Sequence, residues 1–112
     1  MTRGTTPVPK PKRHKSEALT EFACGRDCTV RSRRCDRDPE KSVFAHLRGV
    51  WALGNSTKPG DHFGVIACQS CHDAMDGRIG IPGEVSDYDR LRALYETQYQ
   101  MIEAGLIVIK GA

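Results

Sequence analysis

Hydrophobic and polar residues alternate most clearly over residues 43–48. Three apolar side chains occupy the odd positions, and His46 and Arg48 lie at even positions. This period of two predicts a β-strand with one apolar face. A second short apolar run, residues 63–67, predicts another strand, and the Gly- and Pro-containing segment 49–60 predicts a loop between the two.

Helical periodicity appears in three places. Ser16 is expected to cap a short helix through Cys24, with a buried face made by Leu19, Phe22 and Ala23. A second short helix is expected to begin at Cys71 or His72 and to end near Gly77. The longest helix covers about residues 88–104, capped by Ser86 or Asp87 and stopped by Gly105. Its apolar positions follow helical spacing: Leu91, Leu94, Tyr95, Ile102 and Leu106.

The remaining segments are less regular. Residues 28–31 begin as a strand, and residues 33–41 and 78–85 are expected to be loops. Residues 106–109 are a candidate edge strand. Residues 1–15 are rich in Pro, Thr and Lys and predict a disordered basic tail, so residues 16–112 form a single domain of the α+β class.

The composition adds a requirement for extra stabilisation. Only 38% of the 112 residues are hydrophobic and 6% are aromatic, so the core is thin. Such small domains usually need a metal, disulfides or a partner subunit. No apolar run is long enough to span a membrane, and the basic N-terminus has no apolar segment typical of a secretory signal. We therefore expect a reducing cytoplasm, where clustered cysteines bind metal.

Four of the five cysteines form two pairs along the chain. Six residues separate Cys28 from Cys35, and two separate Cys68 from Cys71. Two such half-sites predict a four-thiolate structural zinc site. Cys24 is left out because a thiol beside Phe22 and Ala23 packs well in a core. A redox pair and simple buried thiols are the alternatives.

The basic charge is concentrated near the N-terminus. Residues 1–16 carry +5, and residues 26–37 carry five arginines against two acids, while residues 84–103 carry a local charge of −3. A polyanion is a plausible partner for the basic part, and solvated charge is the simpler alternative.

Four short motifs together resemble a known family. "GRDCTV", "FAHLRG", "GNSTKPGD" and "IACQSCHDAMDGR" are similar to the HNH nucleases, and most of all to the YbcO-like nucleases of phages and prophages. The resemblance covers about residues 25–80. It implies a small zinc-stabilised ββα-metal core, which is treble-clef-like, followed by a C-terminal helix. It also implies a phage-encoded protein in the cytoplasm of a bacterial host cell.

The resemblance carries roles over to individual residues. Cys28, Cys35, Cys68 and Cys71 match the zinc ligands. His46 matches the general base, and His72 matches the catalytic residue that holds a Mg²⁺ or Mn²⁺ ion. Asp61 matches an acidic position and is a second candidate ligand. Two features depart from the family pattern: Ala45 replaces the usual Asp or His ligand before the general base, and the central Asn is not evident.

The resemblance implies hydrolysis of DNA that leaves a 5′-phosphate and a 3′-hydroxyl. An imidazole titrates near neutral pH, so His46 is suited to deprotonating water. The candidate nucleic-acid contacts are arginines: Arg31, Arg33, Arg34, Arg48 and Arg78. The DNA form stays open, and a phage or host recombination protein is a candidate partner.

Two other functions compete with the nuclease. The first is a non-catalytic zinc-binding module that binds nucleic acid, which the absent ligand at Ala45 favours. The second is a protein-interaction zinc knuckle that dimerises or binds a partner through the acidic amphipathic helix 88–104, whose Tyr88, Tyr95 and Tyr99 suit an interface.

Overall fold

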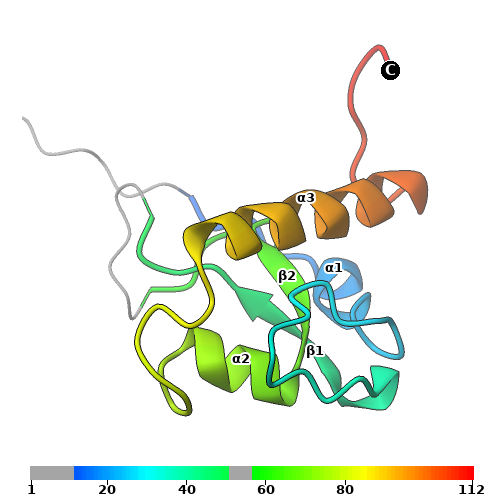
Figure 1. Cartoon of the computed structure of the whole chain (residues 1–112). Coiled ribbons are helices and arrows are strands. Elements are labelled where there is room, and N and C mark those ends of the chain that lie inside the picture. Colours follow the sequence, from blue (N-terminus) through cyan, green and yellow to red (C-terminus); the bar gives the residue numbers. More distant parts are fainter. Residues whose placement is uncertain (1–11, 51–56) are drawn as a thin grey trace, which may run out of the picture.

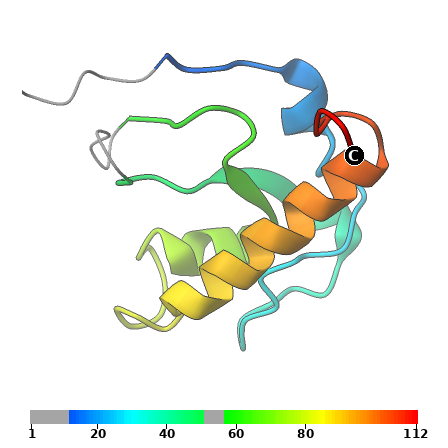
Figure 2. The ribbon, with the colours of Figure 1, turned by 90° about the horizontal axis from the view of Figure 1, so that it is seen from above.

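A two-stranded sheet and three α-helices make up this small α+β fold, seen in a computed structural model that describes residues 12–50 and 57–112. The elements, in chain order, are α1 (Glu17–Glu21), the 3₁₀-helix η1 (Pro39–Lys41), β1 (Ser42–His46), β2 (Gly64–Cys68), α2 (Gln69–Met75) and α3 (Asp87–Glu103). Helix α3 packs on β2, α2 packs on both strands, and α1 packs on β1 (Figure 1). Seen from above, α3 crosses the sheet with α2 near its start and α1 near its end (Figure 2).

The two predicted strands are confirmed with their ends shifted by one or two residues, and they form an antiparallel hairpin. Ser42 lies opposite Cys68, and His46 lies opposite Gly64. The cysteine-bearing end of the hairpin is therefore distant from the end that carries His46. Gly64 is required at that far end, because an added Cβ would lie 2.7 Å from the Ala45 carbonyl oxygen.

Strand β2 is buried along its whole length. On the edge that does not pair with β1, its backbone groups form hydrogen bonds with two threonines instead of another strand. The Thr29 amide and hydroxyl both donate to the Ile66 carbonyl at 2.8 Å, and the Ile66 amide donates to the Thr97 hydroxyl at 3.0 Å. The expected strand at residues 28–31 is wrong. Arg31 has a φ of 50°, so the backbone turns away after this one pairing.

Helix α3 is confirmed at both ends, but its buried face differs from the prediction. Ser86 caps it in a capping box with Asp89, and Gly105 has a φ of 77° just after it. The face toward β2 is made by Ala93, Thr97 and Met101. Two of the side chains predicted to be buried are largely solvent-exposed instead, Leu91 and Tyr95. Small residues at Ala93 and Thr97 allow close packing on the sheet, which the apolar period alone does not reveal.

Three other local predictions need correction. Helix α1 ends at Glu21, so Cys24 lies in the following turn and is exposed rather than buried. Helix α2 begins at Gln69, because the Cys68 side chain already accepts a hydrogen bond from the Cys71 amide. Residues 106–109 form no strand within the described chain.

Residues 12–15, which the sequence assigns to the basic tail, lie against the loop before β2. The Arg13 Nε donates to the Pro59 carbonyl at 3.2 Å, and the Asp61 amide donates to the His14 carbonyl at 2.8 Å. Residues 1–11 lie outside the described chain. None of the helices in the described residues is long and apolar enough to cross a membrane.

Candidate functional site

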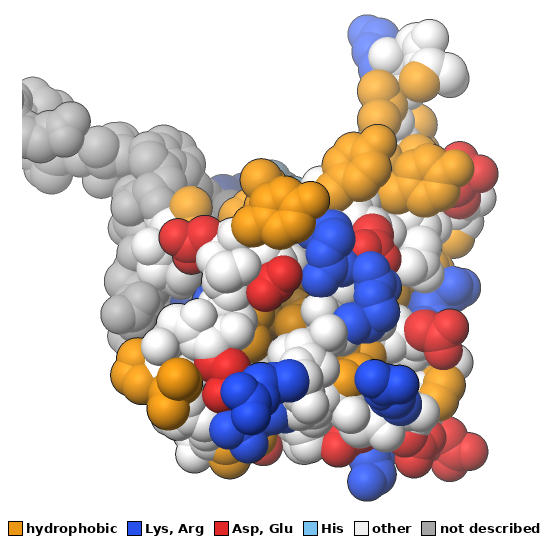
Figure 3. Space-filling model, viewed as in Figure 1, with side chains coloured by type: hydrophobic (Ala, Val, Ile, Leu, Met, Phe, Trp, Pro, Cys, Tyr) orange, Lys and Arg blue, Asp and Glu red, His pale blue; other side chains and the backbone are white. Residues whose placement is uncertain are grey.

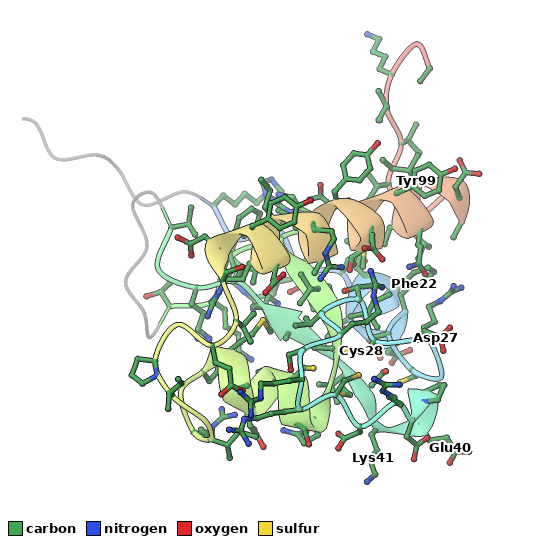
Figure 4. All side chains as sticks on the ribbon, viewed as in Figure 1. Phe22, Asp27, Cys28, Glu40, Lys41 and Tyr99 are labelled. Carbon is green, nitrogen blue, oxygen red and sulfur yellow. The ribbon has the colours of Figure 1, made fainter. Side chains whose placement is uncertain are left out.

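Four cysteines come together at one end of the hairpin. Cys28 and Cys35 belong to the loop before β1, Cys68 ends β2, and Cys71 lies in the first turn of α2. Their four sulfur atoms lie within 4.8 Å of one another (Figure 4, Cys28 labelled). The cluster agrees with the residue set predicted from the spacing, and Cys24 lies outside it.

Neighbouring amides and a hydroxyl point at these sulfur atoms. Cys68 Sγ accepts hydrogen bonds from the Asp36 amide at 3.3 Å and from the Cys71 amide at 3.4 Å. Cys28 Sγ accepts one from the Arg31 amide at 3.5 Å, and the Ser32 hydroxyl lies 3.1 Å from Cys71 Sγ. Such donors stabilise the negatively charged thiolate, which is the form of cysteine that binds metal.

The same geometry lowers the pKa of Cys28 to about 4. The main cause is a hydrogen bond from the Cys71 thiol; burial opposes it, and backbone amides add to it. The pKa of Cys71 is raised for the reciprocal reason. Four convergent sulfurs with a thiolate already favoured fit a closed tetrahedral metal site, with no coordination position left for a reacting water.

At the opposite end of the hairpin, His46 contacts a buried carboxylate. His46 Nε2 lies 2.8 Å from Asp61 Oδ1, and Asp61 is 4% exposed. Arg13 Nη2 donates to the same oxygen at 2.9 Å, and the Ser16 amide donates to Oδ2 at 2.7 Å. Burial acts to raise the pKa of Asp61, but the hydrogen bonds from His46 and Ser16 and the Arg13 charge outweigh it, so the pKa is lowered. Asp61 is therefore ionised at neutral pH.

An ionised carboxylate only accepts hydrogen bonds, so it fixes the proton of His46. The hydrogen must lie on Nε2, which leaves the lone pair of the neutral ring on Nδ1. The pKa of His46 is lowered, chiefly because the ring is buried; Asp61 opposes this effect, and the charges of Arg13 and Lys58 add to it. At neutral pH, His46 is a neutral imidazole whose basic lone pair lies on Nδ1.

His72 in α2 has a similar arrangement. Its Nε2 lies 3.2 Å from Asp76 Oδ2, one helical turn later. Its Nδ1 is buried and has no hydrogen-bond partner among the described residues. A carboxylate beside Nε2 favours a proton there, so the lone pair of the neutral ring again lies on Nδ1.

Two hollows meet at these histidines. The first, about 920 Å³, lies between the end of β1, α2 and the start of α3, and the second, about 530 Å³, lies between α1 and β1. Three side chains line both: His46, Arg48 and His72. Arg13 and Lys58 line the second hollow as well, together with the acids Glu17 and Asp61, so with Arg48 this hollow carries a small excess of positive charge.

Comparison with known proteins identifies the family. The model of the family described as "Putative nuclease YbcO" matches residues 17–104. The chain belongs to the YbcO family. It is 46% identical over 91 residues to "Putative nuclease YbcO" of Escherichia coli strain K12 and equally to "Putative nuclease ybcO" of Enterobacteria phage 82, covering 80% of this chain and 95% of each relative.

One solved structure matches the YbcO fold seen here. It is described as "Structure of a putative bacteriophage protein from Escherichia coli str. K-12 substr. MG1655". The TM-score is 0.64 at 34% identity, over 78% of this chain and 99% of that one. The family resemblance drawn from the four motifs is thus confirmed at the level of YbcO, and a phage relative exists.

The arginines predicted to contact nucleic acid are mostly paired with carboxylates of this YbcO protein. Arg31 donates to both oxygens of Glu96 at 2.8 and 2.7 Å, and Arg34 pairs with Glu84. Arg78 pairs with Asp73 at 2.6 Å and with Asp76 at 3.0 Å, whereas Arg33 is exposed. Arg31, Arg33 and Arg34 belong to the cysteine loop, at the far end of the hairpin from His46.

Sequence reasoning missed the cations nearest to His46. Arg13 and Lys58 line the same hollow as Arg48, although one was assigned to a disordered tail and the other to an unremarkable loop. No short-range pattern could have found them, because Arg13 and Lys58 are 45 positions apart in the chain. The two are brought together by the hydrogen bonds that Asp61 accepts from Arg13 and Ser16.

Proposed function

We propose that this YbcO family member is a metal-dependent DNA endonuclease of the HNH type, with His46 as its general base. The observation that carries the proposal is the His46–Asp61 pair, 2.8 Å apart, at the edge of a hollow that His72 and three cationic side chains also line. The order β1, β2, α2 agrees with a ββα-metal core. The family description as a nuclease supports the same class of reaction.

In the proposed reaction, His46 Nδ1 removes a proton from the attacking water. General-base catalysis of this kind typically contributes about 10²–10⁴-fold in rate. Asp61 holds the ring in the Nε2–H form and stabilises the positive charge that develops on it. Arg13, Arg48 and Lys58 are placed to attract the DNA phosphates to the hollow.

A divalent ion is part of this proposal, and His72 fits it better than Asp61 does. Nδ1 of His72 has no hydrogen-bond partner among the described residues, so its lone pair is free to bind a metal ion. Asp76 lies beside Nε2, and a carboxylate in that position commonly orients a metal-bound histidine. Both oxygens of Asp61 are already occupied by three hydrogen-bond donors, so we assign Asp61 to orienting His46. A bound Mg²⁺ or Mn²⁺ would neutralise the scissile phosphate and the leaving oxygen.

The four-cysteine cluster is proposed to hold a structural Zn²⁺ ion. The sulfur-only donor set and the amide hydrogen bonds to Cys28 and Cys68 suit zinc and leave no open position for catalysis. Such a site joins the loop before β1 to the start of α2. It thereby stabilises the element that carries His72.

The test is nicking of supercoiled plasmid by zinc-loaded protein with Mg²⁺ or Mn²⁺. We expect the wild type to nick DNA and His46→Ala to lose at least about 10²-fold in rate. His62→Ala is the matched control, because His62 is exposed, neighbours Asp61 in the chain and lines neither hollow. Equal rates for wild type and His46→Ala would overturn the proposal.

The second candidate is a non-catalytic nucleic-acid-binding module. It is favoured by Ala45, whose methyl group is fully buried and offers no metal ligand before His46. This module would bind DNA in a salt-dependent manner. It would show no cleavage in either metal, and its affinity would be unchanged in His46→Ala.

A further inference from the structure

We infer that the outer face of α3 and the C-terminal segment form an interface with a second copy of the same chain. We call the four exposed apolar side chains on this face the α3 stripe, which consists of Tyr88, Leu91, Tyr95 and Tyr99. Residues 106–112 are called the C-terminal arm. This inference does not rest on the proposed nuclease activity, although Leu91 also lines the first hollow.

The α3 stripe lies on the side of the helix opposite the buried face. Its members recur at helical spacing, and their exposed fractions are 70%, 65%, 72% and 54% in chain order. Ile102 continues the stripe and is half-buried. Hydrophobic side chains gather over α3 and continue into the arm (Figure 3), and Tyr99 points away from the sheet (Figure 4). A continuous exposed apolar surface of this kind marks an interaction site.

The C-terminal arm leaves α3 on the side away from the sheet (Figure 1). Its direction is fixed where the amides of Leu106 and Ile107 both donate to the Met101 carbonyl, at 2.9 and 3.3 Å. Beyond that point, Val108 is 82% exposed and Ile109 is 53% exposed. An apolar arm held away from its own core is suited to contact another molecule.

The available apolar area is between about half and all of what one partner buries in a standard dimer interface. At about 150–250 Å² for a whole aromatic residue, the exposed parts of the three tyrosines amount to roughly 300–500 Å². The exposed aliphatic side chains of the stripe and arm add roughly 150–300 Å². The sum approaches the roughly 800 Å² that each partner buries in a stable interface.

The spacing of the stripe is self-complementary. Tyr95 is the middle residue of the 17-residue helix. A two-fold axis at Tyr95 would pair two α3 helices antiparallel and place Tyr95 against its own copy, Leu91 against Tyr99, and Tyr88 against Ile102. Every apolar residue of the stripe would thus meet another one, and the interface would close as a dimer.

The arm is long enough to complete this arrangement. Packed helices lie about 8–10 Å apart. Four extended residues reach about 13 Å, so the apolar part of the arm could pass alongside the partner helix. Antiparallel pairing would bring each arm beside the first turns of the partner's α3. The second copy would then cover both the stripe and the arm.

The charge of α3 argues against nucleic acid as the occupant. The helix carries four carboxylates and two arginines. Both arginines are turned toward the protein: Arg92 donates to the Thr29 and Val30 carbonyls, and Arg90 donates to the Met75 carbonyl. Arg31 neutralises Glu96, and the surface of α3 still keeps a net negative charge that would repel a phosphate backbone along the stripe.

The first test is the mass of the full chain by sedimentation equilibrium at about 100 μM, where a micromolar dissociation constant populates the dimer. We expect twice the 12.4 kDa mass of one chain. Tyr95→Glu and a chain ending at Gly105 should raise the dissociation constant at least about tenfold, whereas Ile81→Glu, at a 69% exposed residue in the loop before α3, should not. Circular dichroism and metal content verify that each variant is folded.

The second test examines the antiparallel geometry. In a Cys24→Ser background, Tyr95→Cys should form an interchain disulfide under mild oxidation, because the two thiols would face each other across the axis. Ile81→Cys in the same background is the control and should not. A monomeric wild type, or a dimer that persists in folded Tyr95→Glu, would overturn the inference.

Discussion

Replacing Asp61 by Asn tests how the loop before β2 controls His46. The carboxylate now accepts hydrogen bonds from three donors, His46 Nε2, Arg13 and the Ser16 amide. A carboxamide has one oxygen and one NH₂ group, so it cannot accept from all of them. If its oxygen faces Ser16, its NH₂ faces His46 and forces the proton of that ring onto Nδ1.

The expected magnitude follows from this conflict. A ring protonated at Nδ1 has lost its available base, so the rate of nicking should fall by about 10²–10⁴-fold, the usual contribution of a general base. If the amide is turned the other way, the Ser16 amide faces another donor. A buried unsatisfied donor costs about 1–3 kcal/mol, so the free energy of unfolding should fall by that amount in either orientation.

The assay is the single-turnover nicking rate of Asp61→Asn as a function of divalent ion concentration and pH. If Asp61 orients His46, excess Mg²⁺ or Mn²⁺ should not restore the nicking rate of the variant. If Asp61 were a metal ligand, excess metal ion would restore that rate. The negative charge of Asp61 raises the pKa of His46, so its removal should move the acid limb of the remaining activity to lower pH. A folded variant with near wild-type rate would refute the reasoning.

Three further predictions follow from the same structure. Arg13→Ala should move the acid limb of the nicking rate to higher pH, because the Arg13 charge lowers the pKa of His46; a limb that does not move would contradict this, and Lys12→Ala is the control. Cys68→Ser should abolish binding of one metal ion, and a urea titration should show that most of the chain is already unfolded without urea, because structural zinc contributes about 10 kcal/mol or more in small peptides. A variant that is folded and retains the metal would contradict the proposed ligand set. Thr97→Val should lower the free energy of unfolding by about 1–3 kcal/mol, because the buried Ile66 amide loses its acceptor, whereas Thr20→Val at an exposed hydroxyl should change it little; equal effects would argue against the buried network.

The pH dependence of stability has a defined sign. The pKa values of Asp61 and His46 are both lowered by folding, so the unfolded chain binds more protons at acid pH. For His46, stability declines as the pH falls below its unfolded pKa of about 6.5. For Asp61, the contribution is complete above an unfolded pKa of about 3.9 and is lost as the pH falls through the folded value. Acid should therefore destabilise the wild type at both steps.

Structural features that depend on residues close together in the chain could be predicted well. The spacing of Cys28, Cys35, Cys68 and Cys71 agrees with the cluster, because metal-ligand loops impose short fixed separations. The alternation at residues 43–48 gave β1, and the Ser86 cap and Gly105 stop gave α3. Each of these signals, with the cysteines taken as two separate pairs, depends on residues that are near one another in the chain.

Features that depend on chain path could not be predicted. The pairing of His46 with Asp61 requires the loop before β2 to fold back, and the contact of Arg13 with Asp61 joins residues 48 positions apart. The buried face of α3 was missed because Ala93 and Thr97 face β2 through their small size, which a search for strongly hydrophobic positions does not detect. Tertiary packing determined these choices.

Cleavage of supercoiled plasmid by the zinc-loaded chain, measured across pH with Mg²⁺ or Mn²⁺ beside His46→Ala, tests the central claim most directly. The account predicts nicking by the wild type, with an acid limb below the ordinary histidine pKa of about 6.5 because burial lowers the pKa of His46. It also predicts a loss of at least about 10²-fold in the variant. Nicking that is unchanged in folded His46→Ala, or no nicking by the folded wild type in either metal, would contradict it.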